Sequence, residues 1–195
     1  MNAISTPEPQ VSFIRMDDAT PEELSLIVEL SKKHLNEKLV ETMVDLLEHL
    51  KGPTLGYRVD RYEHSLQTAS RAFREDARVD MVVAALLHDV GDAMAPANHA
   101  ELAASILRPY LDEESVWVVE HHGLFQGYHY FDKIGLDPNA RERHRKNPFF
   151  DATAHFCGSW DQVSFDPDYP TMPLESFVPA LREVFSRPAT GYRTE

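Results

Sequence analysis

The chain has 195 residues, of which 43% are hydrophobic and 26% charged, a composition typical of one soluble globular domain with a buried core. Its formal net charge of −13 disfavours nucleic acid and anionic membranes as partners, and no apolar run reaches the roughly 18 residues of a membrane span. The single cysteine, Cys157, excludes an internal disulfide and suits a reducing compartment, so we expect a cytoplasmic protein.

The first predicted helix begins after Thr20, which can cap it and is followed by a proline and two acidic residues. Apolar residues at helical spacing continue to Leu50, in one long helix or two short ones, and a Gly-Pro pair then ends the pattern. Residues 1–12 contain prolines among polar residues, so we expect a flexible tail there and a single domain over residues 13–195.

Further helical segments follow along the chain, and we find no alternating strand pattern, so the predicted fold class is all-α. Asn98, with Glu101 three positions on, predicts a capping box, and Pro179 is expected to bend the last helix. Residues 166–173 are rich in proline and aspartate and are predicted to be loop. The expected helices cover about 60–75, 79–90, one that begins at Asn98, 112–123, a short charged stretch after Asp137-Pro138, 147–164 and 174–186.

Two ligand-type side chains, His88 and Asp89, close an otherwise apolar helix. Burying them unpaired would cost on the order of 1–3 kcal/mol for the imidazole and more for the carboxylate. A bound metal ion removes that cost. Because adjacent helical residues diverge by about 100°, both can point into one cavity, and the carboxylate can bridge two metals roughly 3.5–4 Å apart.

Other candidate ligands each belong to a different predicted helix, as expected when the interior of a bundle supplies a metal site. Taken singly, they have plainer interpretations: a His-Asp dipeptide arises by chance, and an isolated histidine or aspartate is more often a surface residue. The ordered combination favours a metal site. We interpret the remaining histidines as structural and Cys157 as a small buried residue. The candidates are His64, His99, His121 or His122, and Asp161; the histidines set aside are His34, His49, His129, His144 and His155.

The order of these residues resembles that of the HD-domain superfamily, in which most members are metal-dependent phosphohydrolases. Three stretches look like the branch of mixed-valent di-iron oxygenases that cleave phosphonates, similar to 1-hydroxy-2-aminoethylphosphonate oxygenase and its trimethylammonio counterpart. These stretches are "EHSLQTA" at 63–69, "VVAALLHDVG" at 82–91, and "KNPFF" at 146–150 followed by Trp160-Asp161. The resemblance covers about residues 55–186 and implies an HD-domain helical bundle.

The resemblance also implies two iron ions, in a mixed-valent Fe(II)/Fe(III) centre, with O2 as co-substrate. Between His121 and His122, the second matches better because Tyr128 follows six residues later, although the residues alone leave the choice open. Imidazoles and carboxylates are ligand types that suit iron. The implied ligands are His64, His88, Asp89, His99, His122 and Asp161.

Tyr57 and Asp60 resemble a tyrosine and an acidic residue that precede the first ligand helix in this branch. There the tyrosine approaches the vacant iron position and the acid binds the amino end of the substrate. The resemblance therefore implies catalytic and substrate-binding roles for both, with Asp92, Gln126 and Tyr128 as further substrate contacts.

The chain also departs from the aminoethyl enzyme. Gln126 and Gly158 replace a lysine and an arginine that contact the phosphonate there, and Asp92 replaces the histidine that follows the His-Asp motif. A basic run offers replacement charge, or is a solvated helix face; its members are Arg141, Arg143, Arg145 and Lys146.

The stretches "HHGLFQGYHY" and "SFDPDYP" look more like the trimethylammonio enzyme, whose cationic substrate suits an aromatic and acidic pocket. Candidates for that pocket, most of which suit a core equally well, are Tyr57, Asp60, Phe125, Tyr128 and Tyr130.

The expected function is therefore cleavage of the C–P bond of a 1-hydroxy-2-(trimethylammonio)ethylphosphonate-like substrate to glycine betaine and phosphate. One alternative is the aminoethyl substrate, which gives glycine and phosphate; another is a metal-dependent HD-type phosphohydrolase; a third is a non-catalytic HD module. The expected partner is a small organophosphonate, with no nucleic acid or membrane. The residues do not predict the oligomeric state.

Overall fold

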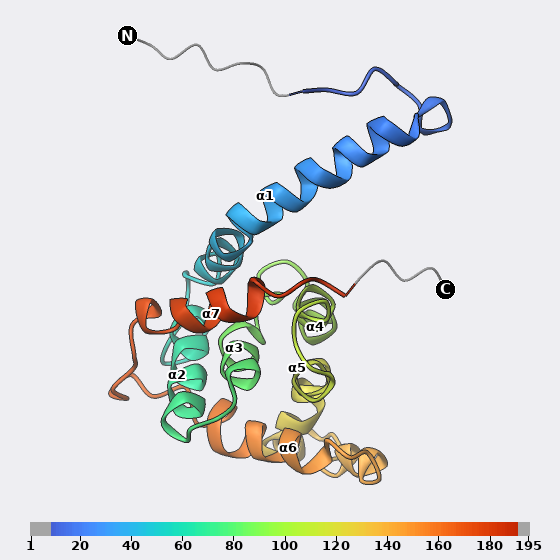
Figure 1. The fold of residues 1–195 in the computed structure, drawn as a ribbon. Helices are drawn as coiled ribbons and strands as arrows, with labels where there is room; N and C mark the ends of the chain where they lie inside the picture. Colours follow the sequence, from blue (N-terminus) through green and yellow to red (C-terminus); the bar gives the residue numbers. More distant parts are fainter. Residues whose placement is uncertain (1–8, 191–195) are drawn as a thin grey trace. The chain divides into compact units, whose positions relative to one another are not determined.

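The computed structural model describes residues 9–190, and every regular element within that range is helical (Figure 1). The prediction of an all-α fold is confirmed for these residues. The chain divides into two compact units, one ending at Leu39 and one starting at Val40, and α1 (Pro21–Glu48) crosses that boundary. The predicted flexible tail, residues 1–12, lies partly outside the described residues. Both the tail and the single domain from residue 13 stay predictions. No helix in the described part of the chain is long and apolar enough to cross a membrane.

Thr20 caps α1, as its sequence predicts, and does so as part of a capping box with Glu23. The Thr20 hydroxyl accepts a hydrogen bond from the Glu23 amide (3.2 Å), and the Glu23 carboxylate accepts one from the Thr20 amide (3.1 Å). Within the second unit, the last turns of α1 bury Met43 and Leu47.

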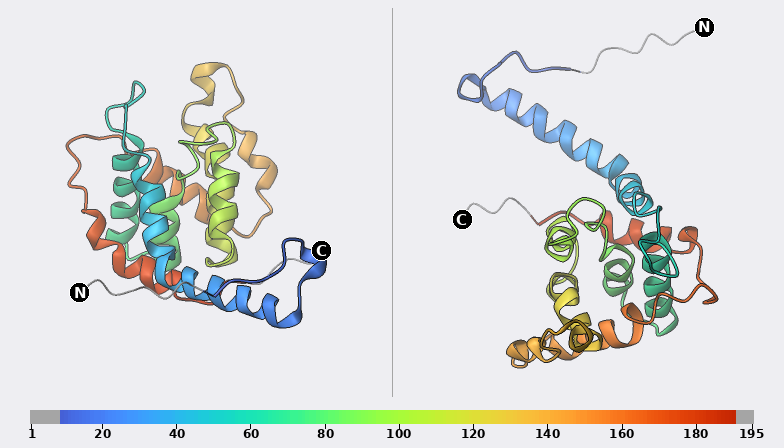
Figure 2. Two further views of the ribbon diagram at one scale, coloured as in Figure 1. Left: turned by 90° about the horizontal axis from the view of Figure 1, so that it is seen from above. Right: turned by 180° about the vertical axis from the view of Figure 1, so that it is seen from behind.

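The second unit is organised around α3, in which residues 81–87 are all buried. A helix that is apolar on every side needs neighbours on every side. α3 packs against α2, α5 and α7, and α4 packs against α5 (Figures 1 and 2). The helices of this unit are α2 (Arg61–Arg74), α3 (Val79–Leu87), α4 (His99–Leu107), α5 (Glu113–Gln126), α6 (Phe150–His155) and α7 (Val178–Phe185).

Aspartate side chains cap two of these helices. Asp60 accepts from the Glu63 amide at the start of α2, and Asp112 accepts from the Ser115 amide at the start of α5, both at 2.8 Å. The cap expected at Asn98 is wrong: α4 does begin at His99, but the Asn98 side chain makes no capping hydrogen bond.

Two predicted helices are shorter or less regular than expected. The charged stretch after Asp137 forms only a 3-10 segment, η4 (Ala140–His144). The helix expected after Asn147 begins at Phe150 and continues beyond α6 as a π-helix, η5 (Phe156–Asp161). Short 3-10 segments of this kind are usual connectors, whereas π-helical turns are rare and gather at functional sites.

The last predicted helix is split into η6 (Leu174–Ser176) and α7. Pro179 lies in the first turn of α7, where its missing amide hydrogen would have no helical partner. It therefore lies at the start of this helix, and the predicted helix is interrupted just before it, at Phe177.

Gly91 lets the turn after α3 pass directly over the start of α4. A Cβ atom at this position would lie 2.5 Å from the carbonyl oxygen of His99 and 2.9 Å from its Cα. Any other residue would push the two backbones apart. The glycine therefore sets the distance between the end of α3 and His99.

We expect Gly91→Ala to lower the free energy of unfolding by about 1–3 kcal/mol, the usual cost of overpacking against atoms that cannot give way. Urea denaturation followed by circular dichroism measures it. A Cβ at Gly52 would meet nothing within 4 Å, so Gly52→Ala is the matched control and should shift stability by no more than about 0.5 kcal/mol. Equal stability of the two variants would contradict this role for Gly91.

Candidate metal centre

Four imidazoles and two carboxylates converge inside the second unit. They come from α2, the end of α3, the start of α4, the end of α5 and η5. All but one of the six are at most 3% exposed. The group, called the His/Asp cluster below, consists of His64, His88, Asp89, His99, His122 and Asp161.

Backbone carbonyls fix the protonation pattern of all four imidazoles. Because a carbonyl can only accept, each Nδ1 must carry the hydrogen, and a neutral ring then has a bare lone pair on Nε2. Backbone contacts of this kind also orient metal-binding histidines. The four Nδ1 contacts are His64 to Ser164 O (2.9 Å), His88 to Ala85 O (2.9 Å), His99 to Pro96 O (3.0 Å) and His122 to Val119 O (2.7 Å).

The Nε2 atoms face one another in two pairs. His64 and His88 approach to 3.2 Å, and His99 and His122 also approach to 3.2 Å. Two neutral nitrogens without hydrogens repel each other at this distance. A cation between the members of each pair would turn that repulsion into coordination.

The carboxylate of Asp89 faces both pairs at once. Its Oδ2 lies 3.5 Å from Nε2 of His64 and 3.6 Å from Nε2 of His88. Its Oδ1 lies 3.4 Å from Nε2 of His99 and 3.3 Å from Nε2 of His122. One oxygen for each pair is the arrangement by which a carboxylate bridges two metal ions.

Asp161 completes the pair formed by His64 and His88. Its Oδ1 lies 3.2 Å from His64 Nε2 and accepts a hydrogen bond from Gln126 Nε2 (2.6 Å). Its Oδ2 is buried and has no hydrogen-bond partner in the described part of the chain. An orphaned buried carboxylate oxygen is costly. The donor set therefore fits two metal ions, one held by His64, His88, Asp161 and Asp89, the other by His99, His122 and Asp89.

Burial and charge shape the titration of the cluster. Burial lowers the pKa of His88 to about 4, so its imidazole is neutral near pH 7. Burial opposes ionisation of Asp89, but the surrounding imidazoles outweigh it and hold the pKa of this carboxyl well below its ordinary value. Burial also opposes charge on His64 and His122, yet Asp161 and Asp89 raise the pKa of both. A metal ion would therefore displace protons from these two rings.

The π-helix places Asp161 in the cluster. The Gln162 amide donates to the carbonyl of Cys157 (3.0 Å), five residues earlier, which widens the turn. Phe156 and Trp160 pack into the core from the same segment. The predicted helix had the correct location, but the wide turn was not anticipated.

The structure brings His122, not His121, into the cluster. The His121 ring stacks on Trp117 with centroids 3.9 Å apart, and its Nδ1 contacts the Trp117 carbonyl at 3.0 Å. Adjacent helical residues point about 100° apart, so only one of the two can face the interior.

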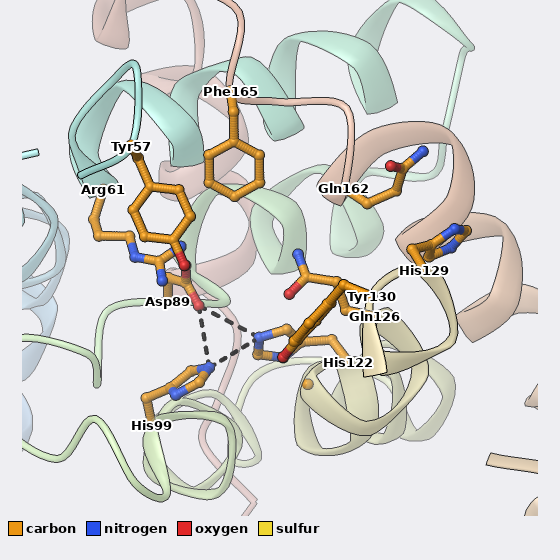
Figure 3. Close-up of a pocket in the computed structure, with 11 residues that line it drawn as sticks. Tyr57, Arg61, Asp89, His99, His122, Gln126, His129, Tyr130, Gln162 and Phe165 are labelled. Atoms are coloured by element: carbon orange, nitrogen blue, oxygen red, sulfur yellow. Dashed lines mark hydrogen bonds and ion pairs between the residues drawn. The ribbon is translucent and has the colours of Figure 1, made fainter. Parts of the chain in front are cut away.

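A cavity of about 410 Å³ opens onto one side of the cluster (Figure 3). Asp89, His99 and His122 line it, whereas His64 and His88 do not. The site formed by His99, His122 and Asp89 is therefore open to a ligand, and the other is enclosed by protein. A catalytic metal site needs such an open position.

Two predicted substrate contacts, Tyr57 and Gln126, line this cavity. The rings of Tyr57 and Phe165 stack with centroids 5.0 Å apart, and Phe165 stacks on His64 at 4.4 Å. Tyr130, a predicted aromatic candidate, lies on the opposite wall (Figure 3).

Three other predicted substrate contacts are absent from the lining of the cavity. Asp60 accepts from the Glu63 amide as the cap of α2. Tyr128 lies under the guanidinium of Arg141, 3.7 Å from ring centroid to Cζ, and Asp92 pairs with Arg61.

The other residues that were predicted to supply charge or aromatic rings to the substrate pocket do not line this cavity either. Phe125 is fully buried in the core. None of the basic residues at 141, 143, 145 and 146 lines the cavity.

The sequence interpretation missed several residues that line the cavity. Among them are Arg61 and Phe165, and also His129 and Gln162 at the end of the cavity away from Arg61 (Figure 3). Arg61 stands three residues before His64, a spacing that places two side chains on one face of a helix. That spacing is a signal available from sequence. Phe165 lies in a loop after η5, and no sequence pattern predicts where its ring points.

In a comparison with protein families, the HD domain model matches residues 61–150. Comparison with curated proteins gives no match. An HD domain is therefore present, within an all-α bundle, and HD domains bind divalent metals. Among the residues of the cluster, Asp161 lies outside the matched range, as do the cavity residues Tyr57 and Phe165.

We expect His122→Ala to lose metal while His121→Ala keeps it, because only the first removes a lone pair from the cluster. Metal analysis after reconstitution of the purified protein with Fe(II) measures this. His122→Ala should retain about one metal per chain or fewer, since a missing ligand weakens the open site most. The reverse result would contradict the placement of these two rings.

Proposed function

We propose that the chain is a di-iron oxygenase that cleaves the C–P bond of a 1-hydroxy-2-(trimethylammonio)ethylphosphonate-like substrate. The observation that carries this proposal is the division of the His/Asp cluster into an enclosed and an open site joined by Asp89. Four imidazoles and two carboxylates are more protein ligands than a single hydrolytic metal requires, and these ligand types suit iron.

Two bound irons would supply the activation of O2 and a Lewis-acid contact for the substrate. In the overall reaction the C–P bond breaks and the carbon is oxidised to a carboxylate. One O2 molecule is reduced, and its two atoms balance one new oxygen on carbon and one on phosphorus. The products are glycine betaine and phosphate, and no external reductant is needed.

The residues of the chain bind, orient and shield the reactants. Asp89 would hold the two sites at a fixed separation, and Gln126 fixes Asp161 through its 2.6 Å hydrogen bond. The stacked rings of Tyr57 and Phe165 cover the side of His64, which keeps water from the enclosed site. The open site faces the cavity, where the substrate would be oriented before reaction.

The lining of the cavity supports the trimethylammonio substrate over the aminoethyl one. A primary ammonium needs hydrogen-bond acceptors, and Asp89 is the one carboxylate among the described residues that line the cavity. A quaternary ammonium needs no acceptor and is recognised by aromatic rings. Tyr130 supplies such a ring, whereas the Tyr57 and Phe165 rings already stack on each other and contact Arg61 and His64.

The aminoethyl substrate, which would give glycine, remains the first alternative. A second candidate is an HD-type phosphohydrolase, favoured by the HD domain match itself. An open metal site beside a cavity also suits attack by a metal-activated water on a phosphate ester. That reaction needs neither O2 nor a change in metal oxidation state, which makes the two functions separable in one assay.

We expect iron-loaded protein to consume one O2 for each phosphate released from the trimethylammonio substrate, and to act more slowly on the aminoethyl analogue. An oxygen electrode combined with a phosphate assay measures both. Asp89→Asn, which weakens the bridging carboxylate, is the negative control. Phosphate release from esters under anaerobic conditions, with no O2 uptake from either phosphonate, would instead establish the phosphohydrolase.

We expect Tyr130→Leu to raise KM for the trimethylammonio substrate roughly 2- to 30-fold, the range that a cation–π contact accounts for. Tyr130→Phe should keep a KM close to the wild-type value because the ring remains. The neighbouring Tyr128 lies outside the cavity, so Tyr128→Leu is the matched control. Steady-state kinetics of the three variants measure the effect, and equal KM values for all of them would remove Tyr130 from the binding site.

A further inference from the structure

Arg61 is the one lysine or arginine among the described residues that line the cavity. Its side chain is 25% exposed and lies in the first turn of α2, three residues before His64. Figure 3 shows Arg61 beside Tyr57 and Asp89, on the wall opposite Tyr130 and His129. The cavity therefore has a cationic wall next to the open site.

Neighbouring side chains hold the guanidinium in place. Its Nε donates to Oδ2 of Asp92 (3.1 Å), and its Nη1 lies 3.5 Å from Oδ2 of Asp89. Its Cζ lies 4.8 Å from the centroid of the Tyr57 ring. An arginine held on several sides has lost its conformational freedom before a ligand arrives, which favours tight and directional binding.

The guanidinium retains unused hydrogen-bond donors. Arginine carries five N–H groups in a planar fork, and Asp92 and Asp89 engage only two of them. No residue in the described part of the chain accepts from Nη2 within hydrogen-bond distance. The free edge suits a ligand with two or three oxygens on one centre, as a phosphonate has.

Other positively charged side chains are not available to this ligand. Arg141 packs over the Tyr128 ring, and Arg145 pairs with Glu142. Gln126, which lines the cavity, is neutral, and its amide nitrogen already donates to Asp161. Charge complementarity at the cavity wall therefore rests on Arg61.

We propose that Arg61 is the specificity-determining residue that binds the anionic phosphonate end of the substrate, with Asp92 as its positioning residue. This inference rests on the proposed function. It also gives the substrate a direction: the phosphonate lies between Arg61 and the open site, and the cationic end points toward Tyr130.

The test uses the iron-loaded full chain and the variants Arg61→Gln, Arg61→Lys and Asp92→Asn. Arg58 is exposed and precedes the same helix, so Arg58→Gln is the matched control. Two inhibitors serve as probes, inorganic phosphate for the anionic end and tetramethylammonium for the cationic end. Iron content, kcat, KM and both inhibition constants are measured for each protein.

We expect Arg61→Gln to raise KM and the inhibition constant of phosphate roughly 10- to 100-fold, with iron content and tetramethylammonium inhibition unchanged. Arg61→Lys should fall in between, because it keeps the charge but loses the planar fork. Asp92→Asn should raise KM by a smaller factor with little change in kcat. Arg58→Gln should match the wild type.

Unchanged phosphate inhibition in Arg61→Gln would overturn the proposal, and so would equal weakening of both inhibitors, which would indicate a general disturbance of the cavity. The dissociation constants of phosphate and tetramethylammonium are also measured by isothermal titration calorimetry, which requires no turnover, and should change as the inhibition constants do. If the wild-type protein fails to consume O2, the proposed oxygenase fails, while the comparison of phosphate with tetramethylammonium still decides the role of Arg61.

Discussion

Mutual repulsion among buried acceptor atoms is the constraint on which this structure depends. The lone pairs of four imidazoles point at each other and at two carboxylates, in a region that is buried except where His99 meets the cavity. While the imidazoles are neutral, no hydrogen bond among these groups can satisfy them, because every Nδ1 hydrogen is already given to a backbone carbonyl. The lone pairs are bridged either by added protons, for which the raised pKa values of His64 and His122 provide, or by a cation that displaces those protons.

That packing depends on an unusually apolar helix. α3 is surrounded by α2, α5 and α7, and it carries His88 and Asp89 just beyond its last turn, where the chain can leave the helical path. Gly91 then brings the start of α4 close enough for His99 to reach the same point. Because one face of the resulting cluster meets the core and the other meets a cavity, a single set of similar ligands becomes two sites with different access.

Much of the frame could be predicted from sequence, because helix periodicity and the aspartate before α5 are local signals. The residues of the His/Asp cluster could also be selected from the sequence, since a buried imidazole or carboxylate at the end of an apolar run needs a partner. The direction of side chains outside regular helices could not be predicted from the sequence. Asp60 looks like a substrate contact in sequence, yet it is taken up by the cap of α2. The ring of Phe165 and the fork of Arg61 reach the cavity only because distant segments fold over α2, and one chain alone carries no pattern for such contacts.

The wide turn from Phe156 to Asp161 has a consequence for how related chains are compared. An α-helical residue turns the chain by about 100°, so loss of a single residue from this stretch would let it relax to an ordinary helix and rotate Asp161 away from His64. An aspartate aligned with Asp161 is therefore informative only when the spacing before it is also kept. A one-residue gap between positions 156 and 161 would separate relatives with a complete enclosed site from those without one, even where every ligand-type residue is present.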